Sequence, residues 1–216
     1  MEDTFIWAGD KGKVENVKDI LRKNPSLNVN WKNEGDHART ALVAACWNGH
    51  DSVVSILLAH PDIDPNLKSE FGYTPFRSAC FRGYTSCVRL LLQDQRVKVK
   101  EPDDFGSTPL FWAASRGYHD VIKWWIVSGR EMDLGTPGDG KTDAIGTAKM
   151  MRKPEVASLL ERFKNDASKT RSEVRLELGI NGQSVHLLIS LCSFHFFGGG
   201  FVFGRRSHFF FFLDQF

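Results

Sequence analysis

Apolar residues recur along the chain in short groups that stand 34 positions apart. Residues 56–58, 90–92 and 124–126 are three such groups, and each belongs to a segment with apolar positions at i, i+3 and i+4. That spacing is typical of a short helix with one buried face. Between these segments lie polar stretches such as HPDIDPN and KEPDDFG, which are rich in turn-forming residues. The pattern predicts pairs of short amphipathic helices joined by tight turns.

Residues that typically begin or end a helix recur with the same spacing of 34 positions. The repeated positions are Thr40, Thr74, Thr108 and Thr142, with Gly49, Gly83 and Gly117. A threonine at the N-cap accepts a hydrogen bond from a free backbone N–H, and a proline, as in Pro75, suits the next position. A glycine suits a left-handed helix end. One period held by several kinds of position indicates a protein built from stacked repeats.

These units resemble ankyrin repeats, whose pattern is roughly G-x-T-P-L-H-x-A-A-x-x-G-H followed by V-x-x-L-L. Residues 72–84 and 106–118 match most of it, and residues 40–50 match with Ala41 for the proline. The flanking units match weakly, and the last has Asp143 for the proline and Met151 for the cap glycine. The resemblance implies an all-α solenoid of about five helix-turn-helix units with hairpin-like loops, plus an irregular apolar C-terminal tail.

We therefore predict an ankyrin repeat domain at residues 1–167 and a tail at residues 168–216. The expected repeats are about 4–30, 31–66, 67–100, 101–134 and 135–166. The first part of the tail, KNDASKTRSEVRLELG, could form a capping helix that ends at Gly179. Its alternating Val174, Leu176 and Leu178 would also suit a strand.

The rest of the tail differs sharply from the repeats, since ten of the 17 phenylalanines follow residue 190. Residues 185–204 carry no charge and are long enough to span a bilayer. Three interpretations remain open: a membrane anchor, a stray coding segment such as a retained intron, and an apolar segment that docks on the last repeat or on a partner.

Two features depart from the ankyrin pattern. Its histidine position holds Val43, Arg77 and Phe111, so we expect the usual side-chain hydrogen bonds between neighbouring turns to be missing. The stretch NEGDHAR lengthens the first connection on the loop side, which is often the binding side of such arrays.

The resemblance also implies that the two positions before each cap glycine lie on a concave surface. They hold Trp47-Asn48, Phe81-Arg82 and Ser115-Arg116. Aromatic residues and arginine dominate binding hot spots, although Trp47 and Phe81 could instead stack on each other between repeats. The hairpin tips offer a second candidate surface with Glu70, Phe71, Asp104 and Phe105, where packing between hairpins is the alternative.

Composition argues against several other functions. The net charge is only +2, so we expect no nucleic-acid binding. Four scattered cysteines, Cys46, Cys80, Cys87 and Cys192, predict free thiols rather than a disulfide framework or a metal site. Residues 137–142 read PGDGKT but lack the first glycine of a phosphate-binding loop. We expect no catalytic residues, no cofactor and no small-molecule substrate.

The N-terminus has no basic region followed by an apolar core, so we expect a cytoplasmic protein, or a nuclear one, rather than a secreted one. The function that fits best is a protein–protein interaction module or adaptor whose partner is another protein. The alternatives are a membrane-tethered ankyrin protein anchored by residues 185–204, and a truncated accessory domain of a larger enzyme.

Overall fold

The computed structural model describes residues 1–180, and residues 1–178 form one compact unit. Within the described residues the chain is all-helical, and the only β-type pairing is an isolated bridge between Asn33 and Arg39. The helices are α1 (Glu2–Asp10), α2 (Val14–Lys23), α3 (Ala41–Asn48), α4 (Asp51–Leu58), α5 (Pro75–Arg82), α6 (Thr85–Gln93), α7 (Pro109–Arg116), α8 (His119–Ser128), α9 (Ala144–Met150), α10 (Pro154–Asn165) and α11 (Ala167–Glu177), with a 3-10 turn at Glu70–Gly72.

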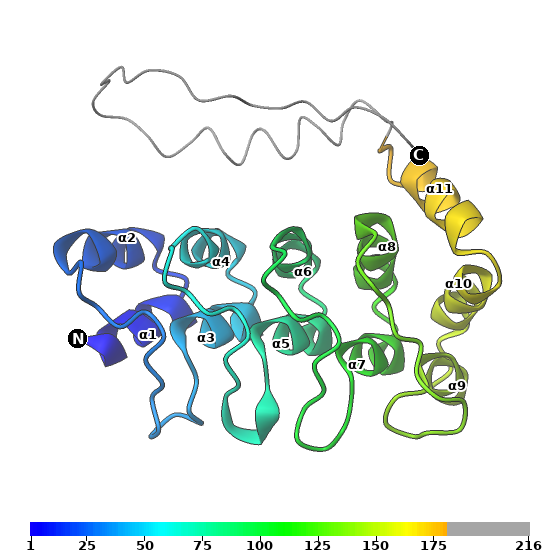
Figure 1. Ribbon diagram of the computed structural model, residues 1–216, viewed down its shortest axis with the longest axis horizontal. Helices are drawn as coiled ribbons and strands as arrows, with labels where there is room; N and C mark the ends of the chain where they lie inside the picture. Colours follow the sequence, from blue (N-terminus) through cyan, green and yellow to red (C-terminus); the bar gives the residue numbers. More distant parts are fainter. Residues whose placement is uncertain (181–216) are drawn as a thin grey trace, which may run out of the picture. The chain divides into compact units, whose positions relative to one another are not determined.

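The first ten helices form five antiparallel pairs that stack in two layers (Figure 1). Helices α1, α3, α5, α7 and α9 lie side by side in the inner layer, and α2, α4, α6, α8 and α10 form the outer layer. The long loops project from the inner layer, away from the outer one (Figure 1). This arrangement confirms the predicted all-α solenoid.

The three central repeats share the same helix caps. The hydroxyls of Thr40, Thr74 and Thr108 accept hydrogen bonds from the backbone N–H groups three residues later, at 3.2, 3.1 and 3.2 Å. Gly49, Gly83 and Gly117 end the helices at φ values of 78°, 76° and 79°, which a glycine adopts without steric cost. The predicted start and stop signals are therefore confirmed for α3, α5 and α7.

The fifth repeat differs from the prediction at both ends of α9. The N-cap is Asp143, whose carboxylate accepts from the Gly146 N–H at 2.8 Å, so Thr142 does not fill that role. The left-handed residue after the helix is Arg152 at φ 55°, whereas Met151 has φ −83°. No further repeat follows it within residues 1–180, and its helix boundaries are shifted by one residue.

Helix α11 confirms the capping helix, and the alternative of a strand at residues 174–178 is wrong. Its Val174 is buried where α11 packs on α8 and α10, and the Arg171 Nε donates to the Ile126 carbonyl at 2.9 Å. The compact unit accordingly includes α11 and extends to Leu178. Without α11, the apolar surfaces of α8 and α10 that it covers would meet water.

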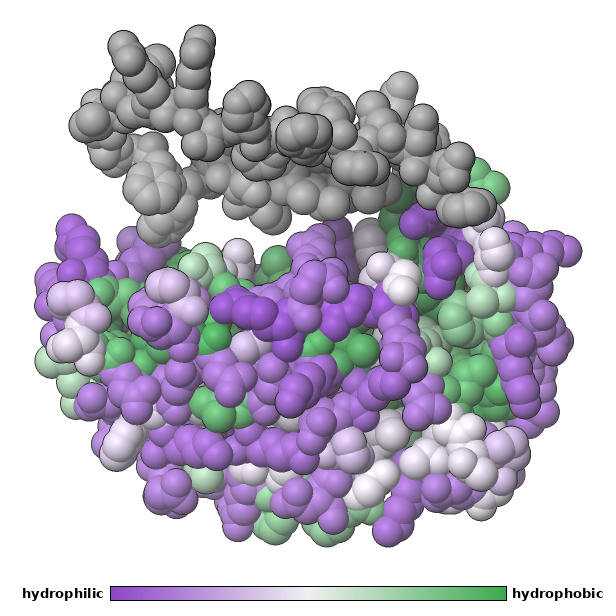
Figure 2. Space-filling model, viewed as in Figure 1, coloured by the Kyte–Doolittle hydropathy of each residue, from purple (hydrophilic) through white to green (hydrophobic). Residues whose placement is uncertain are grey.

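The core lies between the two helix layers. Trp125 is 1% exposed and packs edge-to-face against Phe76 with ring centroids 4.9 Å apart. Trp124, next to it, is only half-buried and carries Arg89 over its ring. Outside the core, hydrophilic residues cover most of the face shown in Figure 2. Within the apolar group at residues 124–126, Trp125 thus belongs to the core and Trp124 does so only in part.

Three of the cysteines, Cys46, Cys80 and Cys87, are free and buried. Burial raises the pKa of the Cys46 and Cys80 thiols and raises that of Cys87 to about 12. Because the thiolate is the reactive form, these three residues serve as small apolar core residues. Cys192 lies outside the described residues.

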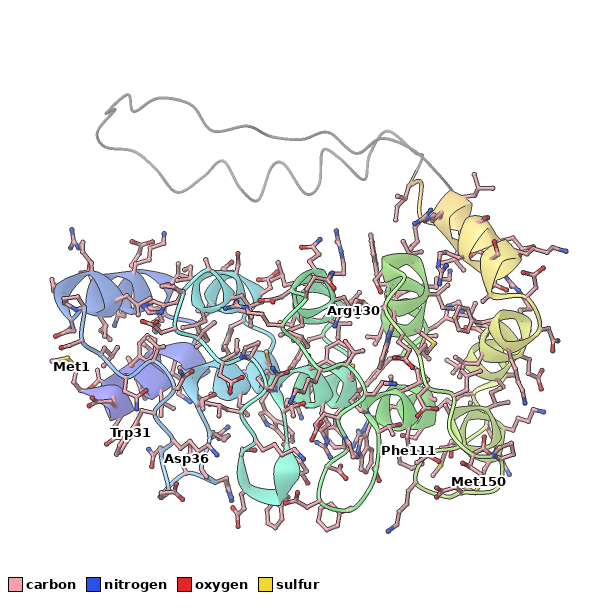
Figure 3. The ribbon with its side chains drawn as sticks, viewed as in Figure 1. Met1, Trp31, Asp36, Phe111, Arg130 and Met150 are labelled. Carbon is pink, nitrogen blue, oxygen red and sulfur yellow. The ribbon has the colours of Figure 1, made fainter. Side chains whose placement is uncertain are left out.

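Arginine and asparagine side chains join neighbouring repeats along the first four repeats of the array. Arg130 lies between α6 and α8 (Figure 3), and its guanidinium donates to the carbonyls of Leu92, Asp94 and Val97. Arg96 donates to the Leu58 carbonyl at 2.7 Å. In this way a later repeat satisfies carbonyl groups that the end of an outer helix leaves free.

Asparagines make a second kind of link. The Asn30 amide donates to the Asp62 carbonyl at 2.7 Å and accepts from the Asp64 N–H at 2.9 Å. Asn66 makes the corresponding pair of bonds to Arg96 and Lys98 in the next repeat.

Candidate protein-binding surface

The C-terminal ends of the inner helices form one continuous surface, which we call the inner face. It is defined by the two positions before each left-handed helix end in repeats two to four: Trp47, Asn48, Phe81, Arg82, Ser115 and Arg116. The rings of Trp47 and Phe81 are stacked, with centroids 5.5 Å apart, and Phe81 meets Trp112 edge-on at 5.1 Å. These three rings are half-buried. Stacking between repeats, the alternative interpretation, is therefore present, and each ring keeps an exposed part.

Two arginines lie over this row of rings. The guanidinium carbon of Arg82 is 5.3 Å from the Trp47 ring centroid, and that of Arg116 is 3.9 Å from the Phe81 centroid. Both arginines are exposed, and neither forms an ion pair with any residue in the described part of the chain. The structure thus brings together four of the six predicted inner-face residues in alternating aromatic and cationic positions.

The other two predicted inner-face residues already have partners within the array. The Asn48 amide donates to the Asp10 carboxylate at 2.8 Å and to the Ala44 carbonyl at 3.0 Å. The Ser115 hydroxyl donates to the Trp112 carbonyl at 2.9 Å. The polar groups of Asn48 and Ser115 are therefore used in hydrogen bonds within the array, which hold the inner face in place.

Beneath the rings lies a buried ion pair that the sequence analysis missed. Arg77 is 1% exposed, and its Nη2 donates to the Asp103 Oδ2 at 3.1 Å. Its guanidinium carbon is 3.6 Å from the Tyr73 ring centroid, 4.6 Å from that of Phe81 and 4.9 Å from that of Trp112. Burial lowers the pKa of Arg77, and the Asp103 charge acts in the opposite direction. Arginine remains charged even so.

Asp103 ties two repeats together through this contact. Its Oδ2 also accepts from the Trp112 indole N–H at 2.9 Å, and its Oδ1 accepts from the backbone N–H groups of Phe105 and Ser107. The expectation that side-chain bonds between neighbouring turns are missing is therefore wrong for this pair of repeats. Aligning the repeats places Asp103 opposite Ser69 and Arg77 opposite Phe111. The sequence therefore held one signal for this ion pair: an acidic residue in one repeat and a basic residue in the neighbouring repeat, each at a position where the other repeat has an uncharged residue.

The hairpin tips are linked to one another by their backbones. The Glu70 N–H donates to the His37 carbonyl at 2.9 Å, and the Asp104 N–H donates to the Phe71 carbonyl at 3.1 Å. The rings of Phe71 and Phe105 stack with centroids 6.1 Å apart while remaining 45% and 52% exposed. The two phenylalanines thus pack on each other, as the alternative interpretation expects, and they also present exposed apolar surface.

Phe71 holds a backbone conformation that side chains rarely adopt, with φ 64° and ψ 17°. Such a conformation costs of order 1 kcal/mol or more, and it persists only where the surrounding structure enforces it. The corresponding position of the next hairpin, Phe105, has no positive φ. In the first hairpin, His37 at the corresponding position also has a positive φ, of 55°. The strained conformation is therefore shared by the first two hairpins and is absent at Phe105.

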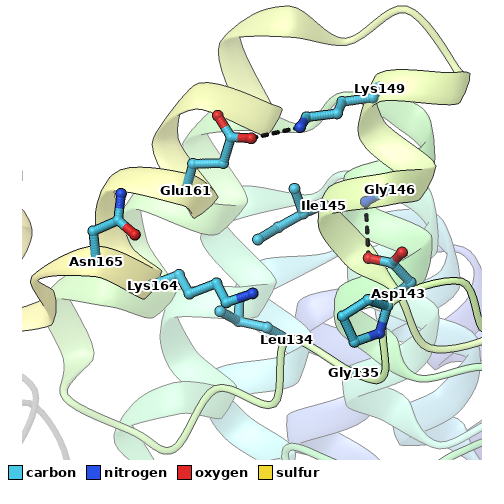
Figure 4. Close-up of a pocket in the computed structure, with 10 residues that line it drawn as sticks. Leu134, Gly135, Asp143, Ile145, Gly146, Lys149, Glu161, Lys164 and Asn165 are labelled. Carbon is cyan, nitrogen blue, oxygen red and sulfur yellow. Dashed lines mark hydrogen bonds and ion pairs between the residues drawn. The ribbon is translucent and has the colours of Figure 1, made fainter.

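Two grooves open on the loop side. One, of about 390 Å³, lies between the first two hairpins and is lined by Asp36, His37, Trp47, Glu70 and Tyr73 among others. The other, of about 600 Å³, lies between the last loop, α9 and α10 (Figure 4). There Lys149 pairs with Glu161 at 2.6 Å, and Asp143 accepts from the Gly138 and Gly146 N–H groups. A carboxylate thus already occupies the helix start beside the PGDGKT loop.

Two further features concern membranes and metals. Among residues 1–180, no helix combines the length and the apolar character needed to cross a bilayer. The described part of the chain also holds no cluster of three or more histidine, cysteine, aspartate or glutamate side chains placed to bind a metal ion. Residues 185–204, for which a membrane anchor is one of three open interpretations, lie outside the described residues.

Comparison with known proteins gives one result for the repeats. The model for "Ankyrin repeats (3 copies)" matches residues 4–103 and 61–136. A search among curated proteins found no match. Ankyrin repeats are generally protein–protein interaction modules. With the stacked helix pairs and repeated caps described above, this match shows that the chain belongs to the ankyrin repeat family.

Proposed function

We propose that this chain is an adaptor that holds another protein on its inner face and hairpin tips. The observation that carries the proposal is the row formed by Trp47, Arg82, Phe81 and Arg116, which runs across three repeats. Large aromatics and arginine are the residues that contribute most to protein interfaces. The family resemblance makes this the concave side of the array.

The mechanism we propose is passive presentation of a fixed surface. The rings are held by their neighbours across repeats, and the tips are held by backbone hydrogen bonds. A surface that is already ordered loses little conformational entropy when a partner binds. The proposal assigns the chain no reaction and no cofactor, and it places the protein in the cytoplasm.

Site-specific photo-crosslinking tests this function. We would replace Trp47 with the photoreactive amino acid p-benzoylphenylalanine in the full chain, because this substitution keeps an aromatic ring at the position. We expect light-dependent adducts with another protein in cells. The matched control carries the same amino acid at Ser55, which is exposed on the outer helix α4. Equal adduct formation at both positions, or none at position 47, would contradict the proposal.

A further inference from the structure

Unpaired charge on the inner face is positive. Within residues 1–180, Arg82 and Arg116 form no ion pair. The carboxylate of Asp10, at the C-terminal end of α1 in the first repeat, is already paired with Lys11 at 2.9 Å and with Arg39 at 3.5 Å. The acidic group at this end is thus neutralised, and the two arginines at the centre are not.

Each of these arginines has one face of its guanidinium near an aromatic ring. The N–H donors of both groups have no protein acceptor among the described residues. A guanidinium carries five such donors, and a carboxylate matches two of them at once. The neighbouring rings also keep water from one side, which strengthens the attraction to an anion.

The repeat geometry sets the spacing between the two arginines. They occupy equivalent positions in helices α5 and α7, which lie side by side in the inner layer. Packed helices lie about 8–10 Å apart. An extended chain advances about 3.3 Å per residue, so acidic residues three positions apart in an extended segment would meet both arginines.

The hairpin tips limit where such a segment can lie. Glu70 and Asp104 are exposed at the tips of the second and third hairpins. Their charges repel an acidic segment that crosses the tips and favour one that stays against the inner helices. At the far end of the row, Met150 adds an apolar side chain that is 68% exposed (Figure 3).

From this arrangement we infer that the inner face binds an extended acidic segment of a partner protein. Two carboxylates about three residues apart lie against Arg82 and Arg116, and apolar side chains between them rest on the rings of Trp47, Phe81 and Trp112. This inference rests on the proposed adaptor function and adds the chemistry of the partner.

Fluorescence anisotropy with designed peptides tests the inference on the full chain at low ionic strength. The probe is a fluorescein-labelled peptide with glutamate at every third position and leucine or alanine between. We expect it to bind at least about tenfold more tightly than the same peptide with lysine for glutamate, which corresponds to about 1.4 kcal/mol. The attraction should weaken as salt is added.

The structure provides a matched control for the arginines. Arg89 lies 3.9 Å from the Trp124 ring centroid but belongs to the outer helix α6. The double variant Arg82→Gln with Arg116→Gln should lose about tenfold or more in affinity for the glutamate peptide. Arg89→Gln should stay within about twofold of the unchanged chain, because it alters the same kind of stacked arginine away from the inner face. Circular dichroism checks that all variants fold.

Several results would overturn the inference. They are equal binding of the lysine peptide, no binding of either peptide, an equal loss in Arg89→Gln, and tighter binding of a single-stranded oligonucleotide of similar length. If photo-crosslinks still form at position 47 in any of these cases, only the acidic partner is wrong. If they do not, the adaptor function fails as well.

Discussion

At the scale of single residues, the Arg77–Asp103 pair is the contact with the largest consequence for stability. Both side chains are almost fully buried, at 2% and 0% exposure. A buried ion pair adds little when compared with well-packed apolar residues. Removal of one partner is costly, because the other charge is left without compensation inside the protein. Here that charge would lie among three aromatic rings.

Replacing Asp103 with alanine should therefore lower the free energy of unfolding by about 3–5 kcal/mol. The substitution leaves the Arg77 charge buried and removes the acceptor for the Trp112 indole and for two backbone N–H groups. Urea unfolding followed by circular dichroism measures the change. Asp104→Ala, at the exposed neighbouring position, is the control and should stay within about 0.5 kcal/mol. Similar losses in the two variants would show that the buried pair has no special role.

The residue scale also shows where sequence reasoning succeeds and where it stops. The threonine caps were predictable because a cap depends on atoms within three residues of each other. The Arg77–Asp103 pair joins residues 26 positions apart, and it forms only because two hairpins approach each other in space. The 34-residue periodicity shows which positions are equivalent in different repeats. It does not show which non-equivalent side chains of two neighbouring repeats come into contact.

At the scale of the element, α11 extends the folded unit beyond the five repeats. Its sequence is mostly charged, and only Thr170 and Val174 are buried within the helix. It nevertheless covers α8 and α10 and adds the Lys123–Glu177 and Arg162–Glu173 ion pairs. The periodicity did not reveal this element because it lies outside the 34-residue register. A terminal helix that closes the array has no equivalent in the other units.

Truncation measures the contribution of α11. A chain that ends after residue 180 should unfold with a free energy at least about 2 kcal/mol higher than one that ends after residue 166. The estimate corresponds to the burial of one apolar side chain together with the surface it covers on α8 and α10. Both chains would be compared by urea unfolding. Val174→Ala in the longer chain should lower the free energy of unfolding by part of the same amount. Identical urea midpoints for the two chains would mean that α11 does not stabilise the array.

At the scale of the folded unit, stability depends on contacts between neighbours. Neighbouring helices of the inner layer pack on one another, and neighbouring outer helices pack less extensively except for α6 and α8. In such arrays the total stability is close to a sum of repeat and interface contributions. The first repeat has a neighbour on one side only, and its outer helix α2 buries only Val17. By contrast, α6 buries Cys87, Val88, Leu91 and Leu92.

This asymmetry predicts an order of hydrogen exchange. Backbone amides of α2 should exchange faster than those of α6, because opening the first outer helix exposes less apolar surface. Mass spectrometry of the exchanging full chain would resolve the two helices by their peptides. Equal protection of α2 and α6 would indicate that the array opens only as a whole.

The links that Arg96 and Arg130 make to the repeats before them have a consequence for synthesis on the ribosome. Chains grow from the N-terminus, and folding generally follows that order. The carbonyls at the end of α4 receive their donor only when Arg96 has been made, and those at the end of α6 wait for Arg130. A repeat that has just left the ribosome thus lacks some of its hydrogen-bond donors until the next repeat has been synthesised. Folding of each repeat should therefore lag behind its synthesis by about one repeat.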